Sequence, residues 1–233
     1  MVHKDNNLII FNSNVSHGNM STKYDDDIIV QKNKRNFFNS INIKESQLYG
    51  LDILYSDIII DLKENSPTKT LKCDAVITQL KDIYVYLAFG DCIPFVVHDQ
   101  EKSIFAFAHL GWQSICKDLH TKVVKSIIMQ YNSNPSNLKI FFGPSITKES
   151  YAFENPAQLQ IPEWKNHISY KNKLYHIDLV GYIIEHLCSL GIDEKNINKS
   201  NVNTATDLNY FSHYRSTRTK EKEGRFIYGA GMI

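Results

Sequence analysis

The sequence has no excess of charge of either sign. Its 26 lysine and arginine residues nearly balance its 25 aspartate and glutamate residues, and the formal net charge is +1. Proteins that collect nucleic acid or anionic lipid need a strong positive field at their surface. The balanced charge argues against both of these partners, so we expect the partners to be small molecules.

Cysteines are few, and two kinds of targeting segment are missing. The four cysteines have no CxxC spacing, which argues against a disulfide framework and against a zinc finger. No apolar run approaches the roughly 18 residues of a membrane span, and the first residues lack the basic and apolar parts of a secretion signal. We therefore expect a cytoplasmic protein without a membrane segment.

Phosphate-binding glycine loops and internal repeats are also missing. Neither GxGxxG nor GxxxxGK[ST] occurs, so the usual nucleotide-binding loops are not indicated. What the chain does have is 233 residues of which 42% are apolar, enough to bury a full core, and no long linker. We expect residues 1–233 to form a single domain, as a monomer or a homodimer.

Helical and strand patterns are interspersed along the chain. Apolar residues at helical spacing predict helices over 27–41, 116–131 and 178–192; acidic residues precede the first, and Gly191 ends the last. Short β-branched and aromatic runs predict a hairpin over 167–178 and strands within 57–62, 74–78, 83–89, 93–97, 103–111, 138–146 and 225–233. This order predicts an α/β fold with a mixed sheet flanked by helices.

A predicted hairpin brings two metal-binding residue types together. The turn at 98–103 joins the strand that follows Cys92 to the strand that ends at His109. A thiolate and a neutral imidazole are good zinc ligands, and a catalytic zinc has about three protein ligands and one open position. Asp91 could orient a ligand. The alternative is that Cys92 is a buried thiol and His109 a hydrogen-bonded core histidine.

Short motifs spread over nearly the whole chain resemble those of one family. They are SHGNMS (16–21), CDAVIT (73–78), GDCIP (90–94), AHLGW (108–112), FFGPSI (141–146) with SYAF (150–153), and FSHYR (211–215) with GR (224–225). Together they resemble the YfiH-type laccase-domain family, also called the polyphenol oxidase or peptidoglycan editing factor family. The resemblance implies a compact α/β/α fold and a zinc ion bound by two histidines and one cysteine, which here fall on His109 and Cys92.

The resemblance also implies chemistry on small molecules. It implies phosphorolysis of adenosine, inosine or methylthioadenosine, with phosphate as the second substrate, and hydrolytic deamination of adenosine. Electrostatic stabilisation of phosphate would then come from Lys34 and Arg215, and Asp91 could assist proton movement. Arg225 is a further candidate for phosphate or ribose, with a packing role as its alternative.

Four departures from the family pattern fall in the expected pocket. Tyr49 stands where the QxHG motif carries the first zinc histidine, and a phenol with a pKa near ~10 is a poor zinc ligand at neutral pH. Gln113 replaces a basic residue, Lys34 replaces an arginine, and Asn203 replaces a pocket cysteine. The site is thus expected to hold zinc and phosphate more weakly. His213 is the best replacement ligand, ahead of three other polar residues: His17, His98 and Asp207. The alternative for each of the four is an exposed or structural role.

Three functions follow from these observations. The first is a zinc-dependent purine nucleoside phosphorylase, with zinc held by Cys92 and His109 and completed by Tyr49, His213 or water. The second is a degenerate family member that binds a nucleoside-like ligand without turnover, which the four substitutions motivate. The third, copper-dependent phenol oxidation, fits an older family name, but the chain lacks the clustered His, Cys and Met pattern of multicopper oxidases.

Overall fold

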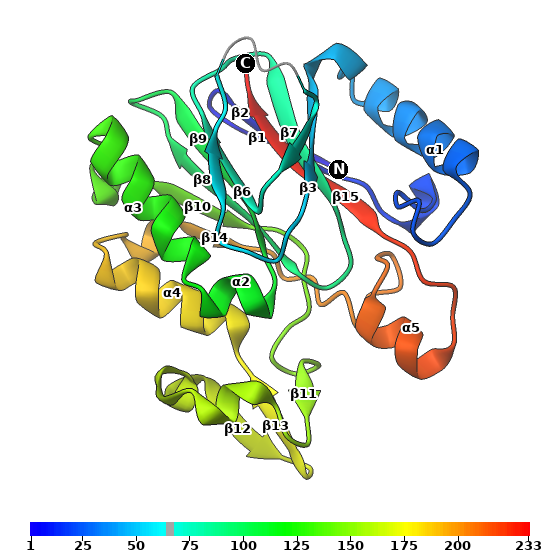
Figure 1. Ribbon diagram of the computed structural model, residues 1–233, viewed down its shortest axis with the longest axis vertical. Coiled ribbons are helices and arrows are strands. Elements are labelled where there is room, and N and C mark those ends of the chain that lie inside the picture. The colour runs from blue at the N-terminus through cyan, green and yellow to red at the C-terminus, as the bar shows by residue number, and fades with distance from the viewer. Residues whose placement is uncertain (64–67) are drawn as a thin grey trace.

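Two six-stranded sheets form the body of the protein in a computed structural model, which describes residues 1–63 and 68–233 (Figure 1). The strands of the first sheet are, in spatial order, β1 (Val2–Asp5), β2 (Leu8–Asn12), β15 (Phe226–Met232), β7 (Ile83–Phe89), β3 (Leu48–Asp52) and β5 (Thr70–Lys72). Those of the second are β14 (Ile197–Lys199), β10 (Lys139–Phe142), β8 (Ile93–Asp99), β9 (Ile104–Leu110), β6 (Ala75–Thr78) and β4 (Ile59–Asp61). Both sheets contain parallel and antiparallel pairs.

Helices cover the outer face of each sheet (Figure 1). The long helix α1 (Asp27–Ser40) covers the first sheet, and α2 (Trp112–Cys116), α3 (Leu119–Tyr131) and α4 (Leu179–Ser189) cover the second. A small sheet of β11 (Ala152–Phe153), β13 (Leu174–Ile177) and β12 (Ile168–Lys171) projects from the body, and α5 (His213–Thr219) precedes β15. Short 3-10 turns lie at Val15–His17, Glu45–Gln47, Pro135–Asn137, Ala157–Gln160, Pro162–His167 and Glu194–Asn196.

The core has three parts because the body has four layers. One cluster lies between the two sheets, a second between the second sheet and helices α2 to α4, and a third between the first sheet and α1. All seven residues of β8 and all seven of β9 are buried, since these strands have a layer on each side. Burying one large apolar side chain stabilises a fold by roughly 1.5–3 kcal/mol, so this hairpin is a rigid support for whatever lies at its end.

The structure confirms the expected mixed sheet flanked by helices, here as two sheets. It places the predicted first helix at α1, where the Asp26 carboxylate accepts hydrogen bonds from two backbone amides, and the predicted stop at Gly191 has a left-handed φ of 90°. The predicted helix 116–131 is broken, because Asp118 has a left-handed φ of 59° that separates α2 from α3. The strand predicted at 57–62 is shortened to β4. Four strands of the first sheet, β1, β2, β3 and β5, were not predicted.

Among the residues described, none of the helices combines the length and the apolar character that a membrane-spanning segment needs.

Candidate active site

The β8–β9 hairpin brings Cys92 and His109 to the same space. Cys92 precedes β8, and His109 in β9 pairs with Pro94. Gly111 follows β9, and a side chain at that position would begin 3.5 Å from Cys92 Sγ and 3.6 Å from His109 Nε2. The sulfur and this ring nitrogen therefore border one small volume, which the missing side chain of Gly111 leaves open.

The other nitrogen of His109 faces a buried carboxylate. His109 Nδ1 lies 3.3 Å from Asp74 Oδ1, and Asp74 is 0% exposed. The same carboxylate accepts hydrogen bonds from the backbone amides of Leu54, Tyr55 and Ser56. A carboxylate in this position fixes the orientation of the imidazole ring and leaves Nε2 directed at Cys92 and Gly111.

The pKa values of His109 and Asp74 are each shifted by the other group. Burial alone would lower the pKa of His109, but Cys92 and Asp74 outweigh burial and raise the pKa to about 9. Burial likewise opposes the ionisation of Asp74, yet its bonds to His109 and Ser56 hold the pKa of the carboxyl below its usual range. Both neighbours thus favour the protonated ring, and a metal at Nε2 would compete with a proton.

Tyr55 is one of two aromatic residues, with Phe89, whose rings meet His109. The Tyr55 ring meets that of His109 edge to face, with centroids 5.7 Å apart. Its backbone amide is tied to Asp74, its carbonyl accepts a 2.7 Å hydrogen bond from Lys117 Nζ, and its side chain is half exposed. The sequence had not singled out Tyr55 or Asp74. The signals were a charged residue in the otherwise apolar run CDAVIT, and a second tyrosine after Tyr49, in a Tyr-Ser pair before the strand β4.

Tyr49, the residue expected in place of a zinc histidine, lies elsewhere on the first sheet. It pairs with Val85 of β7, while Phe89 is the residue of β7 whose ring meets His109, at 5.9 Å. Val85 precedes Phe89 by four positions, or about 13 Å of extended strand. The Tyr49 ring is buried beneath Lys69, whose Nζ lies 3.9 Å from the ring centroid.

Asp91 ties two distant segments to the Cys92 end of β8. Its carboxylate accepts 2.6 Å hydrogen bonds from the Thr204 hydroxyl and from the backbone amide of Tyr214. Its φ of 84° is left-handed, so the backbone turns sharply at this point. Both carboxylate oxygens are therefore occupied in positioning the chain around Cys92.

An apolar cavity of about 310 Å³ opens beside Cys92. Its walls are largely apolar, with a few polar groups among them; its lining includes Asp91, Cys92, Trp112, Ile146, Tyr151, Phe153, Leu179 and His213. His213 is held by Glu223, with 2.7 Å between Nδ1 and Oε1. The volume is at the lower end of the range for small-ligand sites.

A second hollow, the basic pocket, has a volume of about 460 Å³. Lys23, Lys34 and Arg225 supply three positive charges to its lining, which reaches Tyr55. Burial lowers the pKa of Lys34, and nearby Asp27 opposes this shift. Arg225 packs against Gly90, where an added Cβ would lie 2.8 Å from Arg225 Cδ. The basic pocket and the apolar cavity therefore border the same backbone segment, 90–92.

Arg225 is fixed in place by its neighbours. Its Nη2 donates a 2.7 Å hydrogen bond to the Tyr24 hydroxyl, its guanidinium lies 4.3 Å from the centroid of the Tyr24 ring, and it pairs with Glu223 at 2.9 Å. Its Nη1 donates a 2.7 Å hydrogen bond to the Gly224 carbonyl, so the guanidinium is held through both terminal nitrogens at the wall of the basic pocket.

The other predicted site residues have structural surroundings. Arg215 donates to the carbonyls of Thr204, Asp207 and Tyr210 and to the Glu221 carboxylate, and it lies outside the residues that line the basic pocket and the apolar cavity. The Asn203 amide donates to the Ser150 hydroxyl, and Gln113 is exposed on α2. Of the remaining residues weighed as ligands, His17 caps a 3-10 turn with Asn14, His98 is buried in β8, and Asp207 accepts from Asn209.

The donors at Cys92 and His109 do not complete a three-ligand zinc site. Within residues 1–63 and 68–233, the only group of three or more His, Cys, Asp or Glu side chains whose ligand atoms lie within 4.8 Å of one another is Asp118, His120 and His186. One thiol and one imidazole meet beside the Tyr55 ring, whereas the family resemblance implies two histidines and a cysteine.

Comparison with known proteins identifies relatives along almost the whole chain. A family model described as multi-copper polyphenol oxidoreductase laccase matches residues 10–232. Purine nucleoside phosphorylase YlmD of Bacillus subtilis is 27% identical over 164 residues, which are 68% of this chain and 58% of that protein. Purine nucleoside phosphorylase CA_C1699 of Clostridium acetobutylicum is 26% identical over 66% of this chain and 63% of its own length. The matched segment thus spans about three fifths of each relative.

Two solved structures share the fold. The Bacillus licheniformis hypothetical protein YfiH superposes with a TM-score of 0.86 at 20% identity, covering 98% of this chain and 94% of that one. YlmD from Geobacillus stearothermophilus gives a TM-score of 0.85 at 18% identity, with 97% and 92% covered. The two-sheet architecture and its flanking helices are therefore those of a known fold.

Proposed function

Because the chain belongs to the multi-copper polyphenol oxidoreductase laccase family, we propose that it is a purine nucleoside phosphorylase, with its substrates bound around the segment 90–92. The observation that carries this proposal is the basic pocket, where Lys34 and Arg225 face one hollow that reaches Tyr55 beside His109. The names of the B. subtilis and C. acetobutylicum relatives support the same reaction.

The two cavities suit the two substrates. Phosphate is an anion, and Arg225 and Lys34 offer it a guanidinium and an ammonium at one wall. A purine base is flat and largely apolar on its faces, which fits the apolar cavity with Trp112, Tyr151 and Phe153 in its lining. The ribose would then lie across segment 90–92, with the bond between sugar and base near Cys92 and His109.

We assign the remaining predicted residues to positioning. Asp91 holds Tyr214 and Thr204, and Arg215 holds the loop that carries Thr204, so both shape the apolar cavity from outside the reacting atoms. Cys92 and His109 are the residues that would hold a zinc ion, which would supply a Lewis acid. Since the donor set is incomplete, we derive no step that depends on this ion.

A second function is favoured by the same incomplete donor set. A protein that keeps the basic pocket and the apolar cavity but has lost its metal would bind a nucleoside or phosphate without turnover. The missing third ligand beside Cys92 and His109 is the observation that supports this alternative.

The test is an incubation of the purified protein with adenosine, inosine or methylthioadenosine, with and without phosphate, followed by chromatography of the bases. We expect phosphate-dependent release of free base, a loss of at least about tenfold in kcat/KM for Arg225→Gln and for Lys34→Gln, and no change for the exposed Lys102→Gln. Binding without release supports the second function. Inosine formed from adenosine without phosphate identifies deamination instead, and neither binding nor release rejects both functions.

A further inference from the structure

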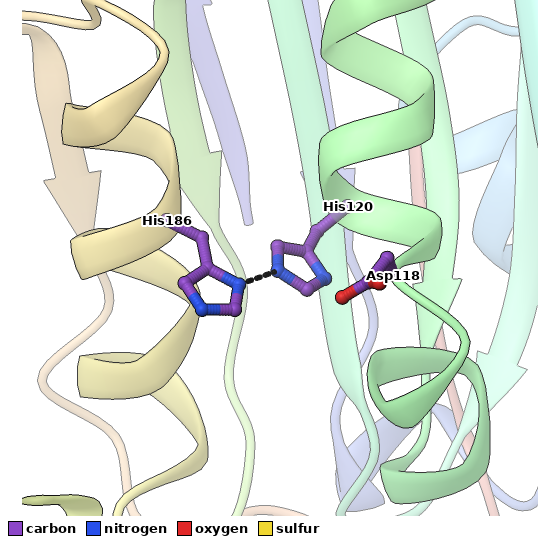
Figure 2. Close-up of side chains that lie close together, drawn as sticks. All are labelled: Asp118, His120 and His186. Carbon is purple, nitrogen blue, oxygen red and sulfur yellow. Dashed lines mark hydrogen bonds between the residues drawn. The ribbon is translucent and has the colours of Figure 1, made fainter. Parts of the chain in front are cut away.

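Three metal-ligating side chains converge where α3 begins and α4 ends, apart from the residues assigned to the nucleoside. Asp118 is the residue before α3, His120 lies in the first turn of α3, and His186 lies in the last turn of α4. Figure 2 shows His120 between the other two side chains, with His186 approaching from the facing helix. One ligand atom from each of the three lies within 4.8 Å of the others.

His120 is the central residue of this cluster, and its hydrogen bonding is incomplete. Its side chain is 0% exposed, and its Nε2 lies 3.1 Å from His186 Nδ1. Its Nδ1 has no hydrogen-bond partner among the residues that the structure describes. The contact with His186 is therefore the one hydrogen bond of this ring among the described residues, and Nε2 is the nitrogen that faces the second imidazole.

The surroundings of His120 disfavour a charged imidazole. Burial, reinforced by the neighbouring His186, lowers the pKa of His120 to about 3. A neutral imidazole is the form that coordinates transition metals.

We propose that Asp118, His120 and His186 bind a divalent cation of the zinc class, with water completing the coordination. Two nitrogens on one tetrahedral zinc, each ~2.0 Å from the ion, are about 3.3 Å apart. The 3.1 Å between His120 Nε2 and His186 Nδ1 is close to this separation. The exposed Asp118 gives the cation a path from solvent and a carboxylate oxygen as third ligand.

The donor set selects the metal. Two imidazoles and one carboxylate suit Zn²⁺, Co²⁺ or Ni²⁺, whereas Ca²⁺ and Mg²⁺ prefer a shell made of oxygen atoms. A bound ion would join the start of α3 to the end of α4. Both helices pack on the second sheet, so the ion stabilises the layer that covers β8 and β9.

The experiment separates this site from Cys92 by removing the thiol. Metal-stripped Cys92→Ser protein is titrated with Co²⁺ and then with Zn²⁺, while visible absorption and the melting temperature are recorded. We expect one Co²⁺ per chain with d–d bands and no thiolate charge-transfer band, displacement by Zn²⁺, and a melting temperature that rises with Zn²⁺ concentration.

Added substitutions test the ligands one at a time. In the Cys92→Ser background, Asp118→Asn and His186→Gln should each weaken Co²⁺ binding at least about tenfold, and His3→Gln, on β1, should not. Asparagine tolerates the left-handed backbone of residue 118, so the first variant is expected to fold. Absence of Co²⁺ binding to Cys92→Ser, or binding that both ligand variants leave unchanged, overturns the proposal. Neither result bears on the nucleoside reaction.

Discussion

Asp74 joins two parts of the candidate site with a single side chain. It is fully buried, accepts hydrogen bonds from the loop that carries Tyr55, and faces His109 Nδ1. Because the loop and the imidazole share this one carboxylate, neither is positioned independently of the other.

Asp74→Asn should destabilise the protein by about 3 kcal/mol, because it removes one partner of a buried charged pair and turns an acceptor into a donor that faces backbone amides. Urea unfolding measures this change. Asp57→Asn is the matched control, since Asp57 lies in the same region but its pair with Lys122 is exposed and should contribute no more than about 1 kcal/mol. Equal losses in the two variants would show that Asp74 has no special role.

Replacing Tyr55 and Tyr49 by histidine, one at a time, tests which of the two tyrosines lies next to Cys92 and His109. Tyr55→His should tighten zinc binding by more than about tenfold, because it places a nitrogen ligand next to Cys92 and His109. Tyr49→His should leave the zinc affinity unchanged if its ring stays beneath Lys69. Zinc titration in the presence of a competing chelator gives both constants, and the opposite ranking would restore Tyr49 as the pocket residue.

Part of this site could be predicted from the sequence alone. The hairpin turn was enough to predict that Cys92 and His109 would be neighbours, since strand pairing fixes which residues meet. The choice between Tyr49 and Tyr55 depends on the register of β3 against β7, which motif spacing does not encode. The role of Asp74 could not be predicted for a similar reason, because the backbone amides that donate hydrogen bonds to it lie in the separate segment 54–56.

At the scale of elements, the fully buried strand β8 contains a titratable side chain, that of His98. His98 is 0% exposed, and neither ring nitrogen has a hydrogen-bond partner in the described part of the chain. Burial lowers the pKa of His98, with Lys139 acting in the same direction and Asp5 and Asp99 opposing. The folded state therefore keeps this ring neutral at a pH where the unfolded chain takes up a proton.

The sign of the pH dependence follows from that difference. As the pH falls through about 6.5, the unfolded state binds a proton that the folded state does not, so the free energy of unfolding decreases by up to ~1.4 kcal/mol per pH unit until the folded pKa is reached. We expect His98→Phe to lose this part of the slope in urea unfolding between pH 7 and pH 5. The exposed His3→Gln should keep it. A slope that His98→Phe leaves unchanged would contradict the assignment.

Elements with strong periodicity were predicted well, and those defined by pairing were not. Helix α1 and the β12–β13 hairpin have clear local signals. Strands β3 and β5 are short and become strands by parallel pairing with distant partners, so their local sequence is a weak guide. The break at Asp118 could not be predicted from local spacing either. The apolar residues keep helical spacing across Asp118, but the left-handed backbone of this residue ends one helix and begins another.

At the scale of the whole molecule, we propose that the chain forms a single cooperative domain. The first and second sheets share one buried cluster, and Trp164 in the 3-10 turn Pro162–His167 stacks on Tyr182 of α4, with 3.9 Å between ring centroids. These contacts tie the outer layers to the body, so we expect the layers to unfold together.

Unfolding by urea should therefore give one midpoint by circular dichroism and by tryptophan fluorescence. The variant Trp112→Phe makes the fluorescence signal report on one position. Trp112 is 39% exposed, and its removal leaves only the buried Trp164 as reporter. Two separated midpoints would indicate that the chain contains more than one domain.

The position of β15 also has a consequence for how the protein is made. Residues 226–232 lie between β2 and β7 and bond to both. A ribosome completes β2 and β7 long before it reaches residue 226, so the facing edges of these two strands emerge from the exit tunnel with no partner. The first sheet can close only after translation has passed residue 232, and until then the nascent chain exposes two open edges to chaperones or to aggregation.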